Sequence, residues 1–405
     1  MKIGVVVTTF PCRSETFFER EMEGLRALGF DIVVFSAARE DGTGSSESNM
    51  RAVYRPKRLS LKAVLSVLYL FTRHPVRLRR LFVLVWRLLK VNRGEAISLL
   101  GNLHTVGYFS RHAERAELSH IHAYFSDWPG VIGLALATIT GKEFSISAHA
   151  RDIFVENGDL QLKVHNAQFV RTCTFAGLRH LRNKLPARYH RRLHVVYHGM
   201  RTAYVGSNPA GFGLEHPHVA NIVLAVGRMV EKKGFECLLR AFRKVLCEGC
   251  GGVLVFAGDG EGMEGLKGLA RELMPEEKVH FLGWQRNEVI LRLMQEATIV
   301  VVPSNVSADG DRDGIPNVIL EAFVSGTAVV ASDLVSIREA VRDRQTGLLF
   351  AAGDADSLAA AIRRLLEDPQ LRMSLCHNAY EKAARCFDTS RNVRHLARLL
   401  KGGER

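Results

Sequence analysis

Short apolar runs rich in β-branched residues alternate with helical periodicity along almost the whole 405-residue chain. This alternation is typical of parallel sheets that helices cover on both faces. The sequence predicts one series of strands at residues 3–8, 32–35, 121–125, 144–148, 172–175 and 195–197, and a second at 222–226, 253–257, 279–282, 299–302 and 328–331. Helices are expected over 234–246, 264–273, 316–325 and 355–367, and the first helix begins with a capping box, Thr16-x-x-Glu19.

The stretch from Gly199 to His218 separates the two series, because it gathers Gly, Pro, Ser and Asn without periodicity. We therefore expect two doubly wound α/β domains, at 1–200 and 221–380, joined by a linker at 201–220 and followed by C-terminal helices at 381–405. Ligands of such sheets bind at the carboxyl ends of the strands, so we expect a site in a cleft between the domains.

Composition excludes several classes of protein. With 47% apolar and 24% charged residues, the chain is neither disordered nor fibrous as a whole. No uncharged apolar run approaches the roughly 18–20 residues of a membrane span, and the first apolar run is too short for a signal peptide. Seven cysteines at scattered positions do not suggest a disulfide framework. These features favour a cytoplasmic protein.

The net charge of +13 is concentrated in the first half of the chain. Residues 51–93 hold 12 Lys and Arg and no Asp or Glu. Helical spacing predicts one apolar face there, formed by Leu78, Leu81, Phe82, Val85, Leu88 and Leu89. Arg77, Arg80 and Arg87 lie on another face, and Trp86 lies on a third face that is basic and aromatic. We expect Arg77, Arg80, Trp86 and Arg87 to contact an anionic membrane surface, through phospholipid headgroups or a diphosphate-lipid substrate. The alternative is a buried helix with a solvated basic back. Nucleic acid is disfavoured because no binding motif accompanies the charge.

The most informative motif is Asp313-Gly-Ile-Pro-Asn-Val-Ile-Leu-Glu321, which follows an apolar strand. Pro316 suits the first turn of a helix and Gly326 its end. The helix N-terminus would then direct backbone N–H groups toward a phosphate, from Gly314, Ile315, Asn317 and Val318. Carboxylates on either side of a phosphate could accept hydrogen bonds from sugar hydroxyls. The alternative is an ordinary acidic loop with a surface glutamate.

Two further strand ends carry candidate groups. Arg228 and Lys233, in Gly227-Arg-Met-Val-Glu-Lys-Lys-Gly234, could converge on a diphosphate. His149 ends a strand of the first domain and either lies in a cleft or is a buried, satisfied histidine. We expect no metal, because His120-x-His122 lies on a strand and Cys247-x-x-Cys250 has no second pair. A Gly260-x-Gly-x-x-Gly265 sequence resembles a dinucleotide fingerprint, but its glutamates would repel pyrophosphate.

Taken together, these residues resemble a GT-B glycosyltransferase of the large retaining family four. The order of the motifs carries the resemblance: Gly227-Arg228 with Lys233-Gly234, Phe256-Ala-Gly-Asp-Gly260, Phe281-Leu-Gly283, Val302-Pro-Ser304, the Asp313 and Glu321 pair, Ser325-Gly326, Glu339 and Thr346-Gly347. Phe10-Pro-x-x-Ser-Glu-Thr-Phe17 and the segment from Phe144 to Ile153 are similar to bacterial exopolysaccharide enzymes of the colanic-acid and amylovoran type. Asp313 replaces the commoner Glu, and Tyr124 stands where relatives usually have His.

The resemblance implies two Rossmann-like domains and a nucleotide-diphosphate sugar as co-substrate, without a cofactor or metal. Arg228 and Lys233 would hold the diphosphate, Glu321 the ribose, and Asp313 with the backbone after it the donor sugar. His149 would reach a sugar hydroxyl, and the base would lie near Gly283-Trp284. The acceptor side would include Ser14, Glu15, Thr16 and Asp152.

The function implied is retaining sugar transfer to a saccharide or polyprenyl-diphosphate-linked acceptor, in surface polysaccharide synthesis. The enzyme would be peripheral at the inner face of the cell membrane. Three alternatives remain: a non-catalytic sugar-nucleotide-binding protein on the same scaffold, a soluble disaccharide synthase and a dehydrogenase.

Overall fold

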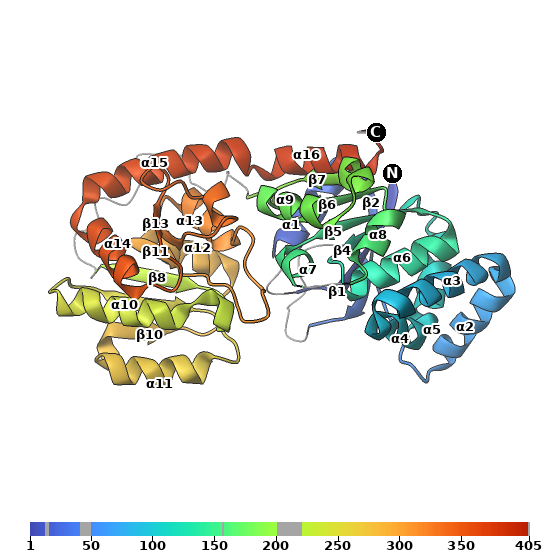
Figure 1. Cartoon of the computed structure of the whole chain (residues 1–405), viewed down its shortest axis with the longest axis horizontal. Coiled ribbons are helices and arrows are strands. Elements are labelled where there is room, and N and C mark those ends of the chain that lie inside the picture. The colour runs from blue at the N-terminus through green and yellow to red at the C-terminus, as the bar shows by residue number, and fades with distance from the viewer. Residues whose placement is uncertain (13–15, 41–49, 156–157, 201–220, 404–405) are drawn as a thin grey trace. The chain divides into compact units, whose positions relative to one another are not determined.

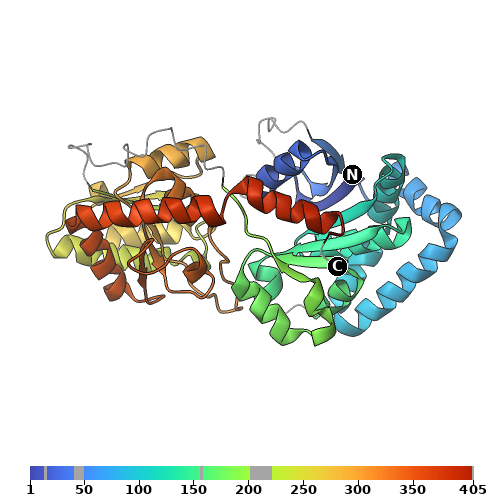
Figure 2. The ribbon, with the colours of Figure 1, turned by 90° about the horizontal axis from the view of Figure 1, so that it is seen from above.

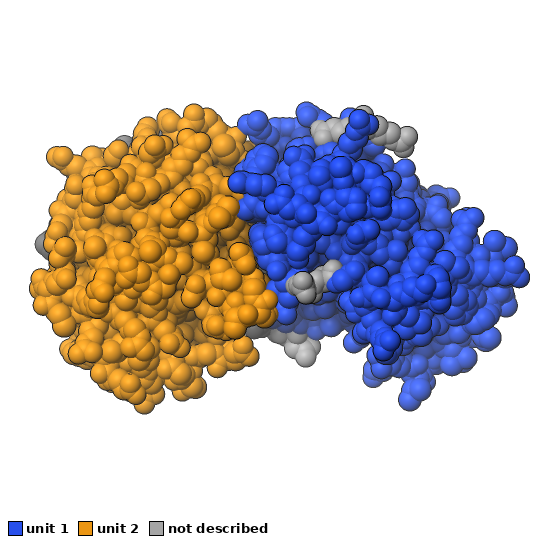
Figure 3. Space-filling model, in the orientation of Figure 1, with its two compact units in different colours: residues 1–199, 389–405 blue, residues 200–388 orange. Residues whose placement is uncertain are grey.

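The computed structural model describes residues 1–12, 16–40, 50–155, 158–200 and 221–403. The chain divides into two compact units, coloured separately in Figure 3. Unit 1 comprises residues 1–199 and 389–405, and unit 2 comprises residues 200–388. The linker expected at 201–220 lies outside the described residues.

Unit 1 is built on a parallel sheet of seven strands in the order β3-β2-β1-β4-β5-β6-β7, most of which are labelled in Figure 1. The strands are β1 (Lys2–Thr9), β2 (Asp31–Ala38), β3 (Arg51–Tyr54), β4 (His120–Tyr124), β5 (Glu143–Ala148), β6 (Phe169–Thr172) and β7 (Leu193–Val195). Val5 and Val6 of β1 contribute to different apolar clusters, because alternate side chains point to opposite faces and both faces are covered. The strand order reverses between β1 and β4, which makes this the switch point of the sheet.

The helices of unit 1 are α1 (Thr16–Ala27), α2 (Leu61–Arg73), α3 (Pro75–Val91), α4 (Arg93–Gly101), α5 (Leu103–Arg115), α6 (Trp128–Thr140), α7 (Ala150–Phe154), α8 (Leu160–Asn166), α9 (Phe175–Lys184) and α16 (Thr389–Leu400). Helix α6 is apolar on all sides and almost wholly buried, as expected for a helix at the centre of a core. Helix α16 returns from the far end of the sequence and packs beside α1, as the red and blue helices of Figure 2 show. Val393 of α16 lies against Gly24 of α1.

Unit 2 contains a six-stranded parallel sheet in the order β10-β9-β8-β11-β12-β13, which reverses between β8 and β11. Its strands are β8 (Ile222–Val226), β9 (Val253–Ala257), β10 (Val279–Phe281), β11 (Ile299–Val302), β12 (Ala328–Ser332) and β13 (Leu348–Phe350). Its helices are α10 (Phe235–Cys247), α11 (Met263–Leu273), α12 (Asn287–Glu296), α13 (Asn317–Ser325), α14 (Ala355–Glu367) and α15 (Pro369–Cys386). Two doubly wound α/β units are therefore confirmed.

Two of the expected strands are misplaced in the sequence interpretation. β6 ends at Thr172 rather than beginning there, because the Thr174 hydroxyl accepts a hydrogen bond from the Gly177 amide and starts α9. β7 likewise lies at Leu193–Val195 instead of 195–197. β3 and β13 were not predicted: the first has only Val53 buried, and the second has three residues.

The basic segment forms a helix, α3, as expected, but the residues on its buried face differ from the expected ones. Phe82 and Leu89 are 44% and 40% exposed, and Leu84 is buried in their place. The expectation for Arg77 needs a larger correction. Its guanidinium donates to the carbonyls of Ile139 and Thr140 at 3.1 and 2.8 Å, so it satisfies the end of α6 and is not presented to a membrane.

None of the helices in the described ranges is both long and apolar enough to cross a bilayer.

The contact between α2 and α5 depends on a glycine. A Cβ at Gly107 would lie 2.1 Å from the Ser66 carbonyl oxygen, whereas a Cβ at Gly268 in α11 would meet open space. We expect Gly107→Ala to lower the free energy of unfolding by about 1–3 kcal/mol, because α2 must shift away. Gly268→Ala is the matched control and should raise it by up to about 1 kcal/mol through helix propensity. Chemical denaturation monitored by circular dichroism measures both, and a stabilising Gly107→Ala would show that α2 is not held by this contact.

Candidate functional site

A lysine–aspartate pair spans the switch point of unit 2. Lys233 follows β8, and Asp313 follows β11, the neighbouring strand across the reversal. The Lys233 Nζ lies 2.7 Å from Asp313 Oδ2, and the Ser304 hydroxyl donates to the same oxygen at 2.6 Å. The structure therefore brings together two predicted site residues from different motifs at the edge of the sheet where ligands of this fold class bind.

The environment of Asp313 keeps it ionised. Burial alone would raise the pKa of this carboxyl, which is 8% exposed. The ammonium of Lys233 and the hydroxyl of Ser304 outweigh burial, so the pKa of Asp313 is lowered. Lys232 adds a further positive charge, and its Nζ lies 3.0 Å from Asp311 Oδ2 and 3.9 Å from Asp313 Oδ1. The site thus combines two buried carboxylates with two ammonium groups.

The turn that presents these lysines requires glycine. Gly234 has φ of +64° and caps α10, and a Cβ there would lie 2.0 Å from the Pro303 carbonyl oxygen. The loops after β8 and β11 can approach closely only because that Cβ is absent. Arg228, in the same loop, is exposed.

Helix α13 carries the second acidic residue of the predicted pair. Its amino end is capped at Pro316 and its carboxyl end at Gly326, which has φ of +76°. Glu321 lies in the second turn and is 5% exposed, so the alternative of a surface glutamate is wrong. The residues expected to offer backbone N–H groups are half-buried: Gly314, Ile315, Asn317 and Val318. Gly283 and Trp284 follow β10, and Trp284 is 45% exposed.

A buried glutamate organises the corresponding switch point of unit 1. Glu21 of α1 accepts hydrogen bonds from Arg171 Nη2 at 2.9 and 2.7 Å and from the Tyr124 hydroxyl at 2.6 Å. The His198 Nδ1 lies 2.8 Å from Glu21 Oε1. Burial would raise the pKa of Glu21, but Arg171, followed by His198 and Tyr124, holds it far below its usual range. We call these four residues the Glu21 cluster.

His149 adjoins this cluster through its ring. The imidazoles of His149 and His198 are stacked at 5.2 Å with 5° between their planes, and Phe17 lies against both. Burial is the main cause that lowers the pKa of each histidine, so both are neutral at neutral pH. Because Nδ1 of neutral His198 faces a carboxylate, that nitrogen carries the proton and Nε2 is left as a hydrogen-bond acceptor.

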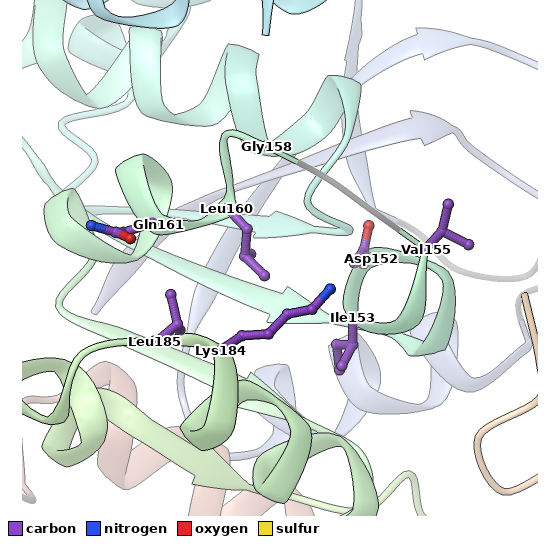
Figure 4. Close-up of a pocket in the computed structure, with 8 residues that line it drawn as sticks. All are labelled: Asp152, Ile153, Val155, Gly158, Leu160, Gln161, Lys184 and Leu185. Carbon is purple, nitrogen blue, oxygen red and sulfur yellow. The ribbon is translucent and has the colours of Figure 1, made fainter. Parts of the chain in front are cut away.

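Asp152 has a local structural role. Its carboxylate accepts the backbone N–H of His149 at 2.8 Å and that of Ser126 at 2.9 Å. Burial raises the pKa of Asp152 to about 7. It also borders a cavity of about 110 Å³ in unit 1, into which the Lys184 side chain extends (Figure 4). The cavity is otherwise lined by Ile153, Val155, Gly158, Leu160, Gln161 and Leu185.

Of the predicted acceptor-side residues Ser14, Glu15 and Thr16, the structure describes Thr16. Ser14 and Glu15 lie outside the described residues, and Thr16 begins α1. Among the described residues, no group of three or more His, Cys, Asp or Glu is arranged to hold a metal ion. His120 and His122 are buried and bond to the hydroxyls of Ser145 and Ser147.

Comparison with known families identifies unit 2. The sequence model described as "Glycosyl transferases group 1" matches residues 211–382. Unit 2 contains a group 1 glycosyl transferase domain. The fold of the chain is GT-B: the structure of HepE from Anabaena in complex with UDP and glucose superposes with a TM-score of 0.73 at 19% identity, over 99% of each chain.

Two curated relatives of the chain are named for the biosynthesis of bacterial polysaccharides. The lipopolysaccharide core biosynthesis glycosyltransferase LpsE of Rhizobium meliloti is 34% identical over 168 residues, which is 42% of this chain and 46% of LpsE. The amylovoran biosynthesis glycosyltransferase AmsK of Erwinia amylovora is 31% identical over 199 residues, 48% of this chain and 49% of AmsK. The chain thus matches about half the length of each of these relatives.

Outside the transferase domain, the sequence interpretation missed Glu21, Arg171 and His198. One signal was available: Arg171 interrupts an otherwise apolar or β-branched strand, and a charge at a buried strand position needs a partner. Nothing in the sequence identifies that partner, because Glu21 lies 150 residues away.

The Glu21 cluster predicts a large effect of Glu21→Gln on stability. The substitution leaves Arg171 buried beside a neutral amide, so we expect the free energy of unfolding at neutral pH to fall by about 3–5 kcal/mol. Arg171→Met in the same chain should recover much of that loss. Glu117→Gln, which removes an exposed ion pair with Lys2, is the control and should cost less than about 1 kcal/mol.

The pH dependence tests the same cluster. Because the pKa of Glu21 is lowered by folding, its stabilising contribution is present above the unfolded value of about 4.3 and is lost as pH falls toward the lowered pKa. The difference between wild type and Glu21→Gln should shrink over that acidic range in urea titrations. A difference that stays constant would mean that the charge of Glu21 is not what stabilises unit 1.

Proposed function

We propose that the protein is a glycosyltransferase that moves a sugar from a nucleotide-diphosphate donor to a saccharide or lipid-linked acceptor in surface polysaccharide synthesis. The observation that carries this proposal is the Lys233–Asp313–Ser304 cluster at the switch point of a group 1 transferase domain. The names of LpsE and AmsK support the polysaccharide context. HepE was solved with UDP and glucose, which makes UDP the first nucleotide to test.

Sugar transfer would leave negative charge on the nucleoside diphosphate, which is the leaving group. An acceptor oxygen bonds to the anomeric carbon while the bond from that carbon to the diphosphate oxygen breaks, and the nucleoside diphosphate leaves. Lys233 has three N–H donors and uses one on Asp313, so two can bind phosphate oxygens. Exposed Arg228 adds a planar, bidentate donor. These cations would stabilise the developing negative charge without a metal.

The carboxylates and the amino end of α13 would orient the donor. Asp313, held ionised by Lys233, is available to accept a hydrogen bond from a sugar hydroxyl. Glu321 would accept from the ribose hydroxyls, one turn inside the helix whose backbone N–H groups favour phosphate. The departing phosphate would take the acceptor proton, and attack from the face it leaves retains the anomeric configuration, as the family resemblance implies.

We also place the protein at the inner face of the cell membrane. Support comes from the 12 basic residues and no acidic ones between positions 51 and 93. Arg80, Trp86 and Arg87 are exposed on α3 and available for such a contact, unlike Arg77. A soluble disaccharide synthase would have no use for this charge, whereas an enzyme with an acceptor in the membrane would.

Ligand-induced stabilisation tests the donor site. We expect one nucleoside diphosphate among UDP, GDP, ADP and CDP to raise the unfolding midpoint of unit 2 by several degrees at about 100 times its Kd. Arg228→Ala should abolish most of that shift, because it removes a diphosphate contact without unpairing a buried group. Arg243→Ala, on the exposed face of α10, is the control. If NAD alone shifted the midpoint, the dehydrogenase alternative would replace this proposal.

Turnover separates an enzyme from a binding protein. Glu321→Gln keeps the shape of the side chain but weakens its hydrogen bonds to the donor, so we expect sugar transfer to fall by about 10–100-fold. Glu248→Gln, at an exposed ion pair with Arg363, should leave transfer unchanged. Nucleotide binding with no turnover in the wild type, on saccharide and lipid-linked acceptors alike, would instead support the non-catalytic alternative.

A further inference from the structure

Helix α2 presents a row of large apolar side chains to solvent. The row occupies positions i, i+3, i+4, i+7 and i+10 of the helix, a single face at helical spacing, and its side chains are 48–73% exposed; they are Leu61, Val64, Leu65, Leu68 and Phe71. We call these five residues the outer row of α2.

Packing within unit 1 does not bury the outer row of α2. Helix α2 attaches to unit 1 through its opposite face, where Ala63, Ser66 and Leu70 are buried and the Ser66 carbonyl lies against Gly107 of α5. In Figure 1 α2 lies at the outer edge of unit 1. The outer row is therefore apolar for a reason other than packing of unit 1.

Helix α3 also presents large apolar side chains to solvent. Its exposed side includes Phe82, Trp86 and Leu89, and the Lys90 ammonium lies 3.5 Å from the centroid of the Trp86 ring. Of the 22 large apolar side chains exposed among the described residues, 14 lie between Leu59 and Leu100. Scattered exposed apolar residues are ordinary, but a concentration of this size marks an interaction surface.

Charge identifies the partner. The segment 51–93 that carries this apolar surface holds 12 basic residues and no acidic one. A second copy of the same face would bring like charges together, and a nucleic acid would leave the apolar row in water. An anionic bilayer satisfies both features, because its headgroups attract Lys and Arg while its interface accepts apolar side chains and tryptophan.

We propose that α2 inserts its outer row into the interface of an anionic bilayer, with the basic residues of α2 and α3 at the headgroups. This inference rests on the membrane location in the proposed function and adds the element that enters the lipid. It differs from the sequence interpretation, which assigned the contact to Arg77, Arg80, Trp86 and Arg87 of α3. In this arrangement α2 lies in the plane of the membrane and unit 1 stays in water.

Vesicle sedimentation tests the proposal with the full chain. The wild type should bind vesicles of phosphatidylcholine with phosphatidylglycerol and should not bind phosphatidylcholine alone. Leu65→Gln with Leu68→Gln should weaken binding at least about 10-fold, because each removes a side chain that would enter the interface. Val335→Gln with Met373→Gln, at equally exposed apolar positions of unit 2, is the matched control and should bind as the wild type does.

A second pair of variants separates insertion from attraction. Arg80→Glu with Arg87→Glu should weaken binding at low salt and much less at high salt, where charges are screened. The Leu65 and Leu68 variant should be weaker than the wild type at both salt concentrations. If it bound like the wild type at both, the outer row would not enter the bilayer and the proposal would be wrong.

Two other outcomes would also overturn the proposal. A wild type that ignores vesicles but forms a dimer lost in the Leu65 and Leu68 variant would identify a second copy as the partner. Binding of RNA in place of vesicles, equally reduced by both pairs of variants, would identify nucleic acid. The UDP-induced thermal shift, measured on the same samples, reports the donor site separately, so its absence counts against the proposed function and not against membrane insertion.

Discussion

The reversal of strand order in each sheet determines which strand ends stay uncovered in this protein. At a reversal, the connections of neighbouring strands leave to opposite sides, and the carboxyl ends of those strands are not covered by a crossing helix. Unit 1 places Glu21 and Tyr124 at such a position, and unit 2 places Lys233 and Asp313 at the other. Away from these strand ends the sheets are covered mainly by apolar side chains, with buried polar residues such as His120, His122 and Ser145 as exceptions.

The two clusters differ in what they leave available to a ligand. Glu21 accepts four hydrogen bonds, two from Arg171 and one each from Tyr124 and His198, so its oxygens are saturated and its role is structural. Lys233 keeps two of its three donors beyond its bond to Asp313, and Arg228 in the same loop is exposed. The Lys233 and Arg228 side chains of unit 2 therefore keep hydrogen-bond donors for a ligand. The carboxylate oxygens of Glu21 in unit 1 are already used within the protein.

Local signals in the sequence were sufficient for most of the fold. Strands β8, β9 and β11 match the expected residues because each is a continuous apolar run between turn residues, and α14 matches because its apolar periodicity is uninterrupted. The pairing of Lys233 with Asp313 could not be read in advance, although both residues were singled out, since it depends on β8 and β11 being neighbours. Arg77 was misassigned for the same reason: a sequence shows its charge but not the carbonyls of α6 that it caps.

The length of the Asp313 side chain suits the cluster around it. The carboxylate lies 2.7 Å from the Lys233 ammonium, and the Ser304 hydroxyl lies 2.6 Å from the same oxygen. The Asp313 backbone is itself held, because the Ser336 hydroxyl donates to its carbonyl at 2.9 Å. A side chain longer by one methylene could not make the same contacts from this fixed backbone. Asp313 therefore fixes the position of the Lys233 ammonium through one oxygen, and its second oxygen lies 3.9 Å from the Lys232 ammonium.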